Sequence, residues 1–173
     1  LNLISKKAKI NHNSVLVQNI IAHLKKPYEQ IQIISCIPNI NEIILTDTIN
    51  QITIKDNGII SAKYIWCLLN SKLINWYVYL FIFGKAIRTM HFDNIVTSRI
   101  PIPPISQHIQ NLFIKQADQI IKLQSEGKNT TILEQQIDNL LYKIYELSYQ
   151  EVKIIDPQFT LTKQEYDRFV VGL

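Results

Sequence analysis

Residues 61–83, SAKYIWCLLNSKLINWYVYLFIF, form a largely apolar stretch that contains neither proline nor glycine. Within it, apolar side chains recur at helical spacing, which predicts a single long helix with a broad buried face. The residues that carry this pattern are Ile65, Leu68, Leu69, Leu73, Trp76, Tyr77 and Leu80. A bilayer span requires about 20 apolar residues, but Lys63 and Lys72 interrupt the stretch, and a lysine in lipid is costly. We therefore expect a buried helix of the protein core and no membrane insertion.

The residues before this helix predict a sheet. Short runs of apolar residues, partly alternating with polar ones, are typical of strands with one buried face. We expect strands at about residues 14–21, 30–37, 43–45 and 51–55. Asp56, Asn57 and Gly58 then favour a turn, because Asn and Gly tolerate positive φ.

The residues after the helix predict a connector and then a second unit. Residues 84–100 are polar and basic, and we expect them to enter a short strand at 95–96. The sequence PIPP at residues 101–104 forces an extended segment, because proline fixes φ and lacks a ladder donor. We place a domain boundary at this segment, so that the first domain spans residues 1–105.

The rest of the chain predicts a helical hairpin. Ser106 suits the N-cap of a helix that runs to about Leu123, and residues 125–129 form a turn. A second helix begins at Thr130 or Thr131, and its apolar residues follow spacings of 4, 3, 4 and 3, the period of a coiled-coil seam. The residues of this seam are Leu133, Ile137, Leu140, Ile144 and Leu147.

Together these patterns predict an α+β protein in three parts. Residues 1–105 form a small mixed-sheet domain around a buried helix, and residues 106–150 form an antiparallel helical hairpin. Residues 151–173 form a C-terminal tail with one short helix at about 163–171. Packing of the two hairpin helices on each other and on the domain explains the seam without any partner.

Charge is distributed unevenly along the chain. Residues 1–105 hold 11 Lys and Arg against 5 Asp and Glu, a net charge of +6, whereas residues 106–173 hold 7 against 9, a net charge of −2. The basic excess of the first part favours a polyanionic partner such as nucleic acid. The chain is also rich in Ile, Asn and Lys, as AT-rich genomes encode, and this composition is a second explanation for part of the excess.

The sequence offers no credible catalytic or metal site. With 4 glycines it cannot build a phosphate-binding loop, and its 4 histidines are too scattered for a metal cluster. Paired carboxylates of the kind that metal-dependent nucleases use are absent from the basic part. Cys36 and Cys67 lie in apolar runs, so we expect both to be buried packing residues.

The start of the chain and its cysteines bear on the compartment. The chain begins at Leu1 without the layout of a signal peptide, and its 2 cysteines form no disulfide framework. We therefore expect a cytoplasmic protein, and a chain that is cut from a longer polypeptide.

Three motifs occur in an order that resembles a known family. They are LNSKLINWY at residues 69–77, PIP at 101–103 and IDNLLYKIYEL at 137–147, the last followed by Glu151. In this order they are similar to the TaqI-like C-terminal specificity domain of type IIG restriction-modification enzymes and related adenine-specific DNA methyltransferases. The resemblance covers roughly residues 14–156.

The resemblance implies a target recognition domain that reads a short sequence of double-stranded DNA. The methyltransferase and nuclease domains that it serves would lie earlier in the same polypeptide, and they would use S-adenosyl-methionine and Mg²⁺. The Asn-Pro-Pro-Tyr/Phe methylation motif of the family is absent from these residues. The resemblance therefore implies no catalytic residue and no cofactor in this chain.

Two stretches are candidates for DNA contact. Arg, Lys, Asn and Gln read base edges in the major groove, while phosphate contacts set the position of the protein. The stretch after the long helix supplies Lys85, Arg88, Thr89, His91 and Asn94, and the stretch at the end of the first strand supplies Gln18, Asn19, His23, Lys25 and Lys26. A solvated loop is the alternative for either stretch.

The side chains of these stretches suggest different roles. We expect Arg88 to read bases and the lysines of both stretches to contact phosphates. Met90 and Phe92 either wedge beside an extruded base or anchor their loop to the core, and we favour the anchor.

The resemblance also implies that the helical hairpin docks the recognition domain onto the rest of the polypeptide. We expect Tyr142 and Tyr145 on its second helix, with Ile109 and Phe113 on its first, to form that surface, and we expect weak self-association of the isolated chain. Three alternatives stay open: a protein–protein assembly module whose basic surface is incidental, a stand-alone specificity subunit that acts in trans, and an enzyme in its own right. A steep salt dependence of DNA binding distinguishes a DNA-binding module from an assembly module.

Overall fold

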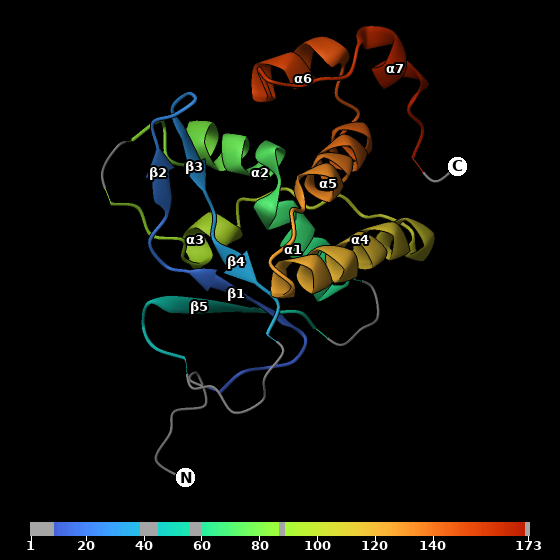
Figure 1. Ribbon diagram of the computed structural model, residues 1–173. Coiled ribbons are helices and arrows are strands. Elements are labelled where there is room, and N and C mark those ends of the chain that lie inside the picture. The colour runs from blue at the N-terminus through green and yellow to red at the C-terminus, as the bar shows by residue number, and fades with distance from the viewer. Residues whose placement is uncertain (1–8, 39–44, 56–59, 87–88, 172–173) are drawn as a thin grey trace.

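The first part of the chain folds into short strands (Figure 1). The computed structural model describes residues 9–38, 45–55, 60–86 and 89–171. The strands of this part are β1 (Ser14–Gln18), β2 (Ala22–Leu24), β3 (Gln30–Gln32), β4 (Ser35–Cys36) and β5 (Ile49–Thr53). One sheet has the order β4-β1-β5, and the other pairs β2 with β3.

The expected α+β class is confirmed, with a difference in the sheets. We expected a sheet of mixed strand direction, but the strand pairings in the described residues are all antiparallel. Parallel pairing needs a crossover connection, usually a helix, and no helix occurs between β1 and β5 in the described part of the chain.

Two of the expected strands are interrupted. The strand expected at 14–21 ends at Gln18, and the strand expected at 30–37 breaks at Ile33. The N–H of Ile33 donates to the side-chain Oδ1 of Asn75 at 2.7 Å. Because this bond takes the place of a ladder bond, β3 and β4 are separate strands of different sheets.

The remaining strand expectations have mixed outcomes. The strand expected at 51–55 is present as β5, and its Ile52 lies opposite Val15 of β1. Most of the strand expected at 43–45, and the turn expected at 56–58, lie outside the described residues.

The long apolar stretch is not one helix. It forms α1 (Ala62–Asn70), α2 (Lys72–Tyr77) and a π-helical turn, η2 (Val78–Ile82), with a bend of 60° at the break between α1 and α2. At the break, the N–H of Ser71 donates to the Leu68 carbonyl at 3.1 Å, and its Oγ accepts from the Ile74 N–H at 3.2 Å. Ser71 therefore ends one helix and caps the next. Within the described ranges, no single helix has the length and apolar content to cross a bilayer, and the bent pair meets that test by length and composition only.

The helical hairpin is confirmed. Its helices are α4 (Gln107–Ser125) and α5 (Thr131–Ile144), and the Ser106 Oγ accepts from the Ile109 N–H at 3.3 Å at the start of α4. The tail contains α7 (Lys163–Arg168), which is shorter than expected, and α6 (Tyr149–Ile155), which was not expected.

A short helix replaces an expected strand before the hairpin. The strand expected at 95–96 is instead α3 (Asn94–Thr97). The Asp93 carboxylate accepts from the N–H groups of Ile95 and Val96 at 2.9 and 3.1 Å. This N-cap favours the helical turn over an extended strand.

Helices α1 and α2 lie in the middle of the molecule (Figure 1). α1 contacts β1 and β4 on one side and α4 on the other, and α2 contacts β3, α5 and α6. A large buried cluster contains Val15 of the sheet, Leu68 of α1 and Phe113 of α4, so the core continues past residue 105. A smaller cluster joins Leu73 of α2 to buried residues of α5, α6 and α7.

The two cysteines lie in different surroundings. Cys67 is buried as expected, and burial raises the pKa of its thiol. Cys36 was expected to be buried, but it is exposed on β4. β4 is an edge strand that pairs only with β1 in the described sheet, so one side of it is left uncovered.

Candidate nucleic-acid interface

The two stretches expected to contact DNA lie side by side in the structure. An isolated antiparallel bridge joins Ile20, between β1 and β2, to His91, before α3. We call the surface around this bridge the polar rim and define it as residues 18–26, 85–86 and 89–94. The bridge turns two distant parts of the sequence into one surface.

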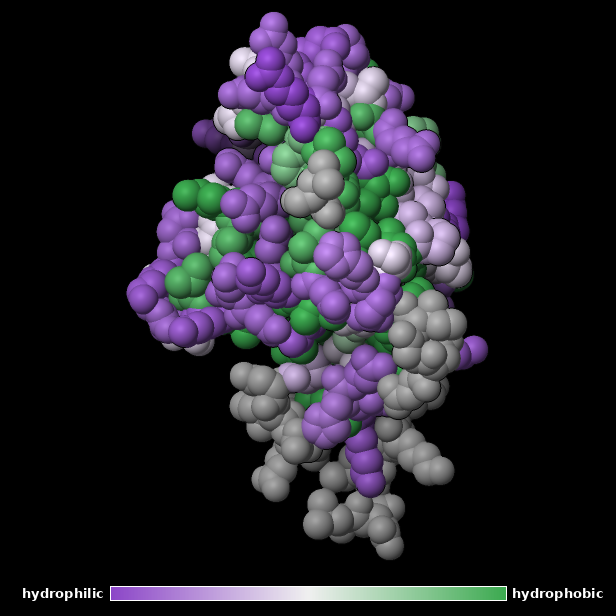
Figure 2. Space-filling model, turned by 90° about the vertical axis from the view of Figure 1, so that its right-hand side faces the viewer, coloured by the Kyte–Doolittle hydropathy of each residue, from purple (hydrophilic) through white to green (hydrophobic). Residues whose placement is uncertain are grey.

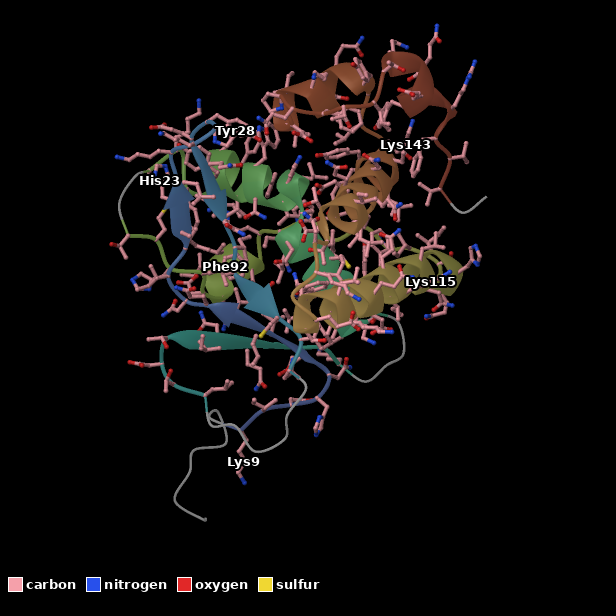
Figure 3. The ribbon with its side chains drawn as sticks, in the orientation of Figure 1. Lys9, His23, Tyr28, Phe92, Lys115 and Lys143 are labelled. Atoms are coloured by element: carbon pink, nitrogen blue, oxygen red, sulfur yellow. The ribbon has the colours of Figure 1, made fainter. Side chains whose placement is uncertain are left out.

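Two backbone hydrogen bonds hold the bridge, and two buried side chains anchor it. The N–H of Ile21 donates to the Met90 carbonyl at 3.0 Å, and the N–H of Phe92 donates to the Asn19 carbonyl at 2.7 Å. Met90 and Phe92 are buried, which confirms the expected anchor, and Figure 3 shows Phe92 in the interior beside α3. His91, which lies between them, is exposed, so buried and exposed side chains alternate along this segment as they do in a strand.

An amide network lies behind the bridge. The Asn50 Nδ2 donates to the Phe92 carbonyl at 2.6 Å and to the Asn19 Oδ1 at 3.3 Å. The Asn19 Nδ2 lies 3.5 Å from the Asp47 carbonyl, and the Asn19 Oδ1 lies 3.3 Å from Nδ1 of His91. Asn50 was not among the expected site residues, because only the pairing of β5 with β1 brings it here.

Three exposed lysines belong to the rim. Lys25 and Lys26 follow β2, and Lys85 follows η2, where its N–H donates to the Tyr79 carbonyl at 3.0 Å. The ion pairs formed among the described residues involve none of these three lysines. Their charges are therefore available to an anionic partner.

Three carboxylates lie close to these lysines or to the bridge. Asp93 caps α3 through its Oδ1, and the Glu29 Oε2 accepts from the Tyr79 hydroxyl at 3.4 Å. Asp47 is exposed next to Asn19. These carboxylates offset part of the lysine charge, so the rim is polar as well as basic.

The other expected site residues have different surroundings. His23 is half-buried on β2 (Figure 3), its ring centroid lies 5.9 Å from that of Tyr79, and its Nε2 is buried without a hydrogen-bond partner among the described residues. Gln18 is half-buried on β1. Thr89 and Asn94 are exposed, and Arg88 lies outside the described residues.

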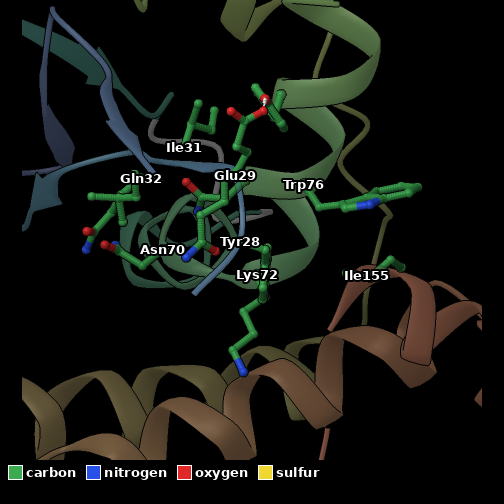
Figure 4. A pocket seen from close by; sticks show the side chains of 12 residues that line it. Tyr28, Glu29, Ile31, Gln32, Asn70, Lys72, Trp76 and Ile155 are labelled. Atoms are coloured by element: carbon green, nitrogen blue, oxygen red, sulfur yellow. Dashed lines mark hydrogen bonds between the residues drawn. The ribbon is translucent and has the colours of Figure 1, made fainter. Parts of the chain in front are cut away.

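An ionic centre with two buried carboxylates and the half-exposed Lys72, which the sequence did not predict, joins α2 to the C-terminal helices. The Lys72 N–H donates to the Asp138 Oδ1 at 2.9 Å, and the Lys72 Nζ pairs with the Asp156 Oδ2 at 2.7 Å. Lys72 and Tyr28 line a cavity of about 220 Å³, and Figure 4 shows the Lys72 side chain pointing toward the C-terminal helices. Burial raises the pKa of Asp138 to about 7. The Tyr142 hydroxyl is buried without a hydrogen-bond partner among the described residues.

The expected docking surface of the hairpin is largely covered by the chain itself. Tyr142 and Phe113 are fully buried, so the expectation that they face a partner is wrong. Tyr142 belongs to the small cluster formed with α6 and α7, and the Phe113 ring lies 5.1 Å from the Tyr64 ring of α1. Tyr145 and Ile109 are half-buried. Weak self-association stays a prediction.

The outer side of the hairpin has a mixed surface. A groove of about 480 Å³ runs between α4, α5 and the residues after α7, and Figure 2 shows hydrophobic surface between polar side chains on this side. Its apolar lining residues are Leu112, Leu140, Phe169 and Val170. Lys115 and several glutamines border it, so this side is less suited to a polyanion than the polar rim.

Metal ligation and similarity to known proteins also bear on the function of this surface. In the described ranges, no group of three or more His, Cys, Asp or Glu side chains is arranged to hold a metal ion. No protein-family model matches the chain, and neither a curated protein nor a solved structure is similar to it. The assignment of the candidate interface therefore rests on the geometry of the polar rim.

Proposed function

We propose that this chain recognises a specific sequence of double-stranded DNA, as the specificity domain of a larger cytoplasmic restriction-modification enzyme that acts on adenine. The observation that carries the proposal is the polar rim, in which the Ile20–His91 bridge joins two stretches and three exposed lysines flank them. Amide, imidazole and hydroxyl groups suit base edges, and lysines suit phosphates. The net charge of +6 in residues 1–105 supports a polyanionic partner.

In this proposal the chain binds and positions DNA, and other domains carry out the chemistry. Methyl transfer and cleavage would take place on methyltransferase and nuclease domains of the same polypeptide, with S-adenosyl-methionine and Mg²⁺ bound there. The order of the three sequence motifs supports this arrangement. The helices after residue 105 would contact those domains.

The salt dependence of binding tests the proposal. Each phosphate contact contributes about −0.9 to the slope of log K against log salt concentration. We expect the double variant Lys25→Ala/Lys26→Ala to weaken binding to all duplexes alike and to reduce the magnitude of the slope by about 2. Fluorescence anisotropy with a labelled duplex at several salt concentrations measures both effects.

The matched control is the double variant Lys115→Ala/Lys122→Ala on α4. Both lysines are exposed, and Figure 3 shows Lys115 across the molecule from β2. The control removes the same net charge, so the slope should keep its wild-type value if the rim is the binding surface. Absence of duplex binding at low salt, or an equal loss of slope in both double variants, would contradict the proposal.

A further inference from the structure

The Ile20–His91 bridge presents two side chains together on the surface. Ile20 and His91 are directly opposed, and the flanking bonds from Ile21 to Met90 and from Phe92 to Asn19 make them a non-hydrogen-bonded pair. In such a pair the side chains lie on the same face and closer together than in the other pair type. Ile20 is 46% exposed and His91 is exposed.

The amide network fixes which nitrogen of His91 carries the proton. The Asn50 Nδ2 lies 2.6 Å from the Phe92 carbonyl oxygen, so this atom is the amide donor. The same Nδ2 lies 3.3 Å from the Asn19 Oδ1, which therefore accepts, and the Asn19 Nδ2 faces the Asp47 carbonyl in agreement. The His91 Nδ1, 3.3 Å from that Oδ1, must then be the donor.

This proton position leaves one ring nitrogen of the exposed His91 as an acceptor. In neutral imidazole one ring nitrogen donates and the other accepts. With the proton on Nδ1, the Nε2 of His91 is the acceptor, and the hydrogen bond that the described residues make to this ring is at Nδ1. In the major groove, only the exocyclic amino groups of adenine and cytosine offer donors, and a methyl group is found on thymine alone.

We infer that His91 and Ile20 read an A·T base pair in the major groove, an inference that rests on the proposed function. The Nε2 of His91 accepts a hydrogen bond from the adenine N6 amino group, and Ile20 packs against the thymine C5 methyl group. An A·T pair presents both groups together, whereas a G·C pair presents an amino group without the methyl. The pairing of an acceptor with an exposed apolar side chain therefore selects A·T.

The test combines changes in the protein with changes in single base atoms. Wild-type chain first selects preferred duplexes from a random pool. At each A·T position of the selected duplex, adenine is then replaced by the purine base that lacks the N6 amino group, or thymine by uracil, which lacks the methyl. At one position we expect the first change to weaken wild-type binding about tenfold and the second about threefold.

Two variants assign each effect to its side chain. In His91→Ala the loss on removing the amino group should disappear while the loss on removing the methyl remains, and in Ile20→Ala the reverse should hold. The matched controls are His108→Ala and Ile132→Ala, because both residues are exposed on the hairpin. In these control variants, removal of the amino group and removal of the methyl group should each weaken binding as much as in the wild type.

The proton position has its own measurement, which needs no DNA. Long-range ¹H–¹⁵N NMR of the wild-type chain at neutral pH should show His91 protonated on Nδ1. A proton on Nε2, or a loss on removing the amino group that persists in His91→Ala, or a preference for cytosine at this position, would overturn the inference while leaving the proposed function in place. Absence of any sequence preference in the selection would overturn the proposed function and the inference with it.

Discussion

Asp138 links the stability of the protein to pH through a single buried carboxyl group. It is 7% exposed and accepts the N–H bond from Lys72 at the start of α2. Its pKa is raised to about 7, chiefly by burial and to a smaller extent by the charges of Asp156 and Glu134, while the hydrogen bond and charge of Lys72 act in the opposite direction. Because the pKa is above its ordinary value, the protonated form stabilises the fold. This contribution is complete below about pH 4 and is lost as the pH rises through about 7.

Substitution of Asp138 by Asn should remove this pH dependence. Asn keeps an oxygen that can accept the Lys72 N–H but has no charge to bury. Between pH 5 and pH 8 the wild type should lose on the order of 2 kcal/mol of unfolding free energy relative to Asp138→Asn. Urea unfolding at several pH values measures the difference. Asp118→Asn is the control, because this carboxylate on α4 is largely exposed and pairs with Lys63 at the surface, and the variant should follow the wild-type pH profile.

At the scale of elements, the break between α1 and α2 depends on Asn75. Its Nδ2 donates to the Ser71 and Leu69 carbonyls at 2.7 and 3.0 Å, and its Oδ1 accepts from the Ile33 N–H. One side chain thus stabilises the end of α1 and the gap between β3 and β4. Asn75→Ala removes the side-chain partner of the Ile33 N–H and of the Leu69 carbonyl, while the Ser71 carbonyl keeps the Asn75 N–H at 3.1 Å. We expect a loss of about 2–4 kcal/mol in unfolding free energy.

Urea unfolding at constant pH measures this loss. The control is Asn111→Ala on the exposed side of α4, which should change the unfolding free energy by less than about 0.5 kcal/mol. If the two variants lose equal amounts, Asn75 does not hold the break in the way its bonds suggest.

The elements also show what could be predicted from the sequence. The hairpin follows from periodicity and the Ser106 cap, because both signals are local. Helix α6 was missed although Ser148 and Glu151 form a capping box, a signature that is visible in the sequence. The break at Ser71 was missed for another reason: apolar spacing continues through it, and a bond of Asn75 reaches Ile33, 42 residues away between β3 and β4.

The candidate site was predictable in composition but not in arrangement. Both stretches of the polar rim were identified from their polar and basic side chains. Their contact through Ile20 and His91 is a tertiary feature, and so is the position of Asn50 on β5 behind the bridge. The alternation of Met90, His91 and Phe92 was the one local sign that this segment is extended, and it is too short to identify by itself.

At the scale of the whole molecule, the two buried clusters should unfold together. Trp66 belongs to the large cluster, and Trp76 packs against the small one. Helix α1 contacts the three-stranded sheet and α4, and α2 contacts β3, α5 and α6. Because these two helices connect the clusters, we expect one cooperative transition.

Two tryptophan variants measure this cooperativity. In Trp76→Phe the remaining tryptophan is Trp66, so the fluorescence reports on the large cluster. In Trp66→Phe the remaining tryptophan is Trp76, so the fluorescence reports on the small cluster. Within each variant, the fluorescence midpoint in urea should coincide with the midpoint from far-UV circular dichroism. Separate midpoints would instead mean that the C-terminal helices and the sheets unfold in separate steps, and that the two parts behave as independent domains.

The bend between α1 and α2 determines where the polar rim begins. At 1.5 Å per residue, the arm formed by Lys72–Ile82 is about 16 Å long, so a turn of 60° carries its far end about 14 Å sideways. That offset is roughly three strand spacings. If the same residues formed one straight helix, its C-terminal end would lie well away from β2. The segment that leads from Lys85 to the bridge at His91 would then have to start from a different edge of the molecule.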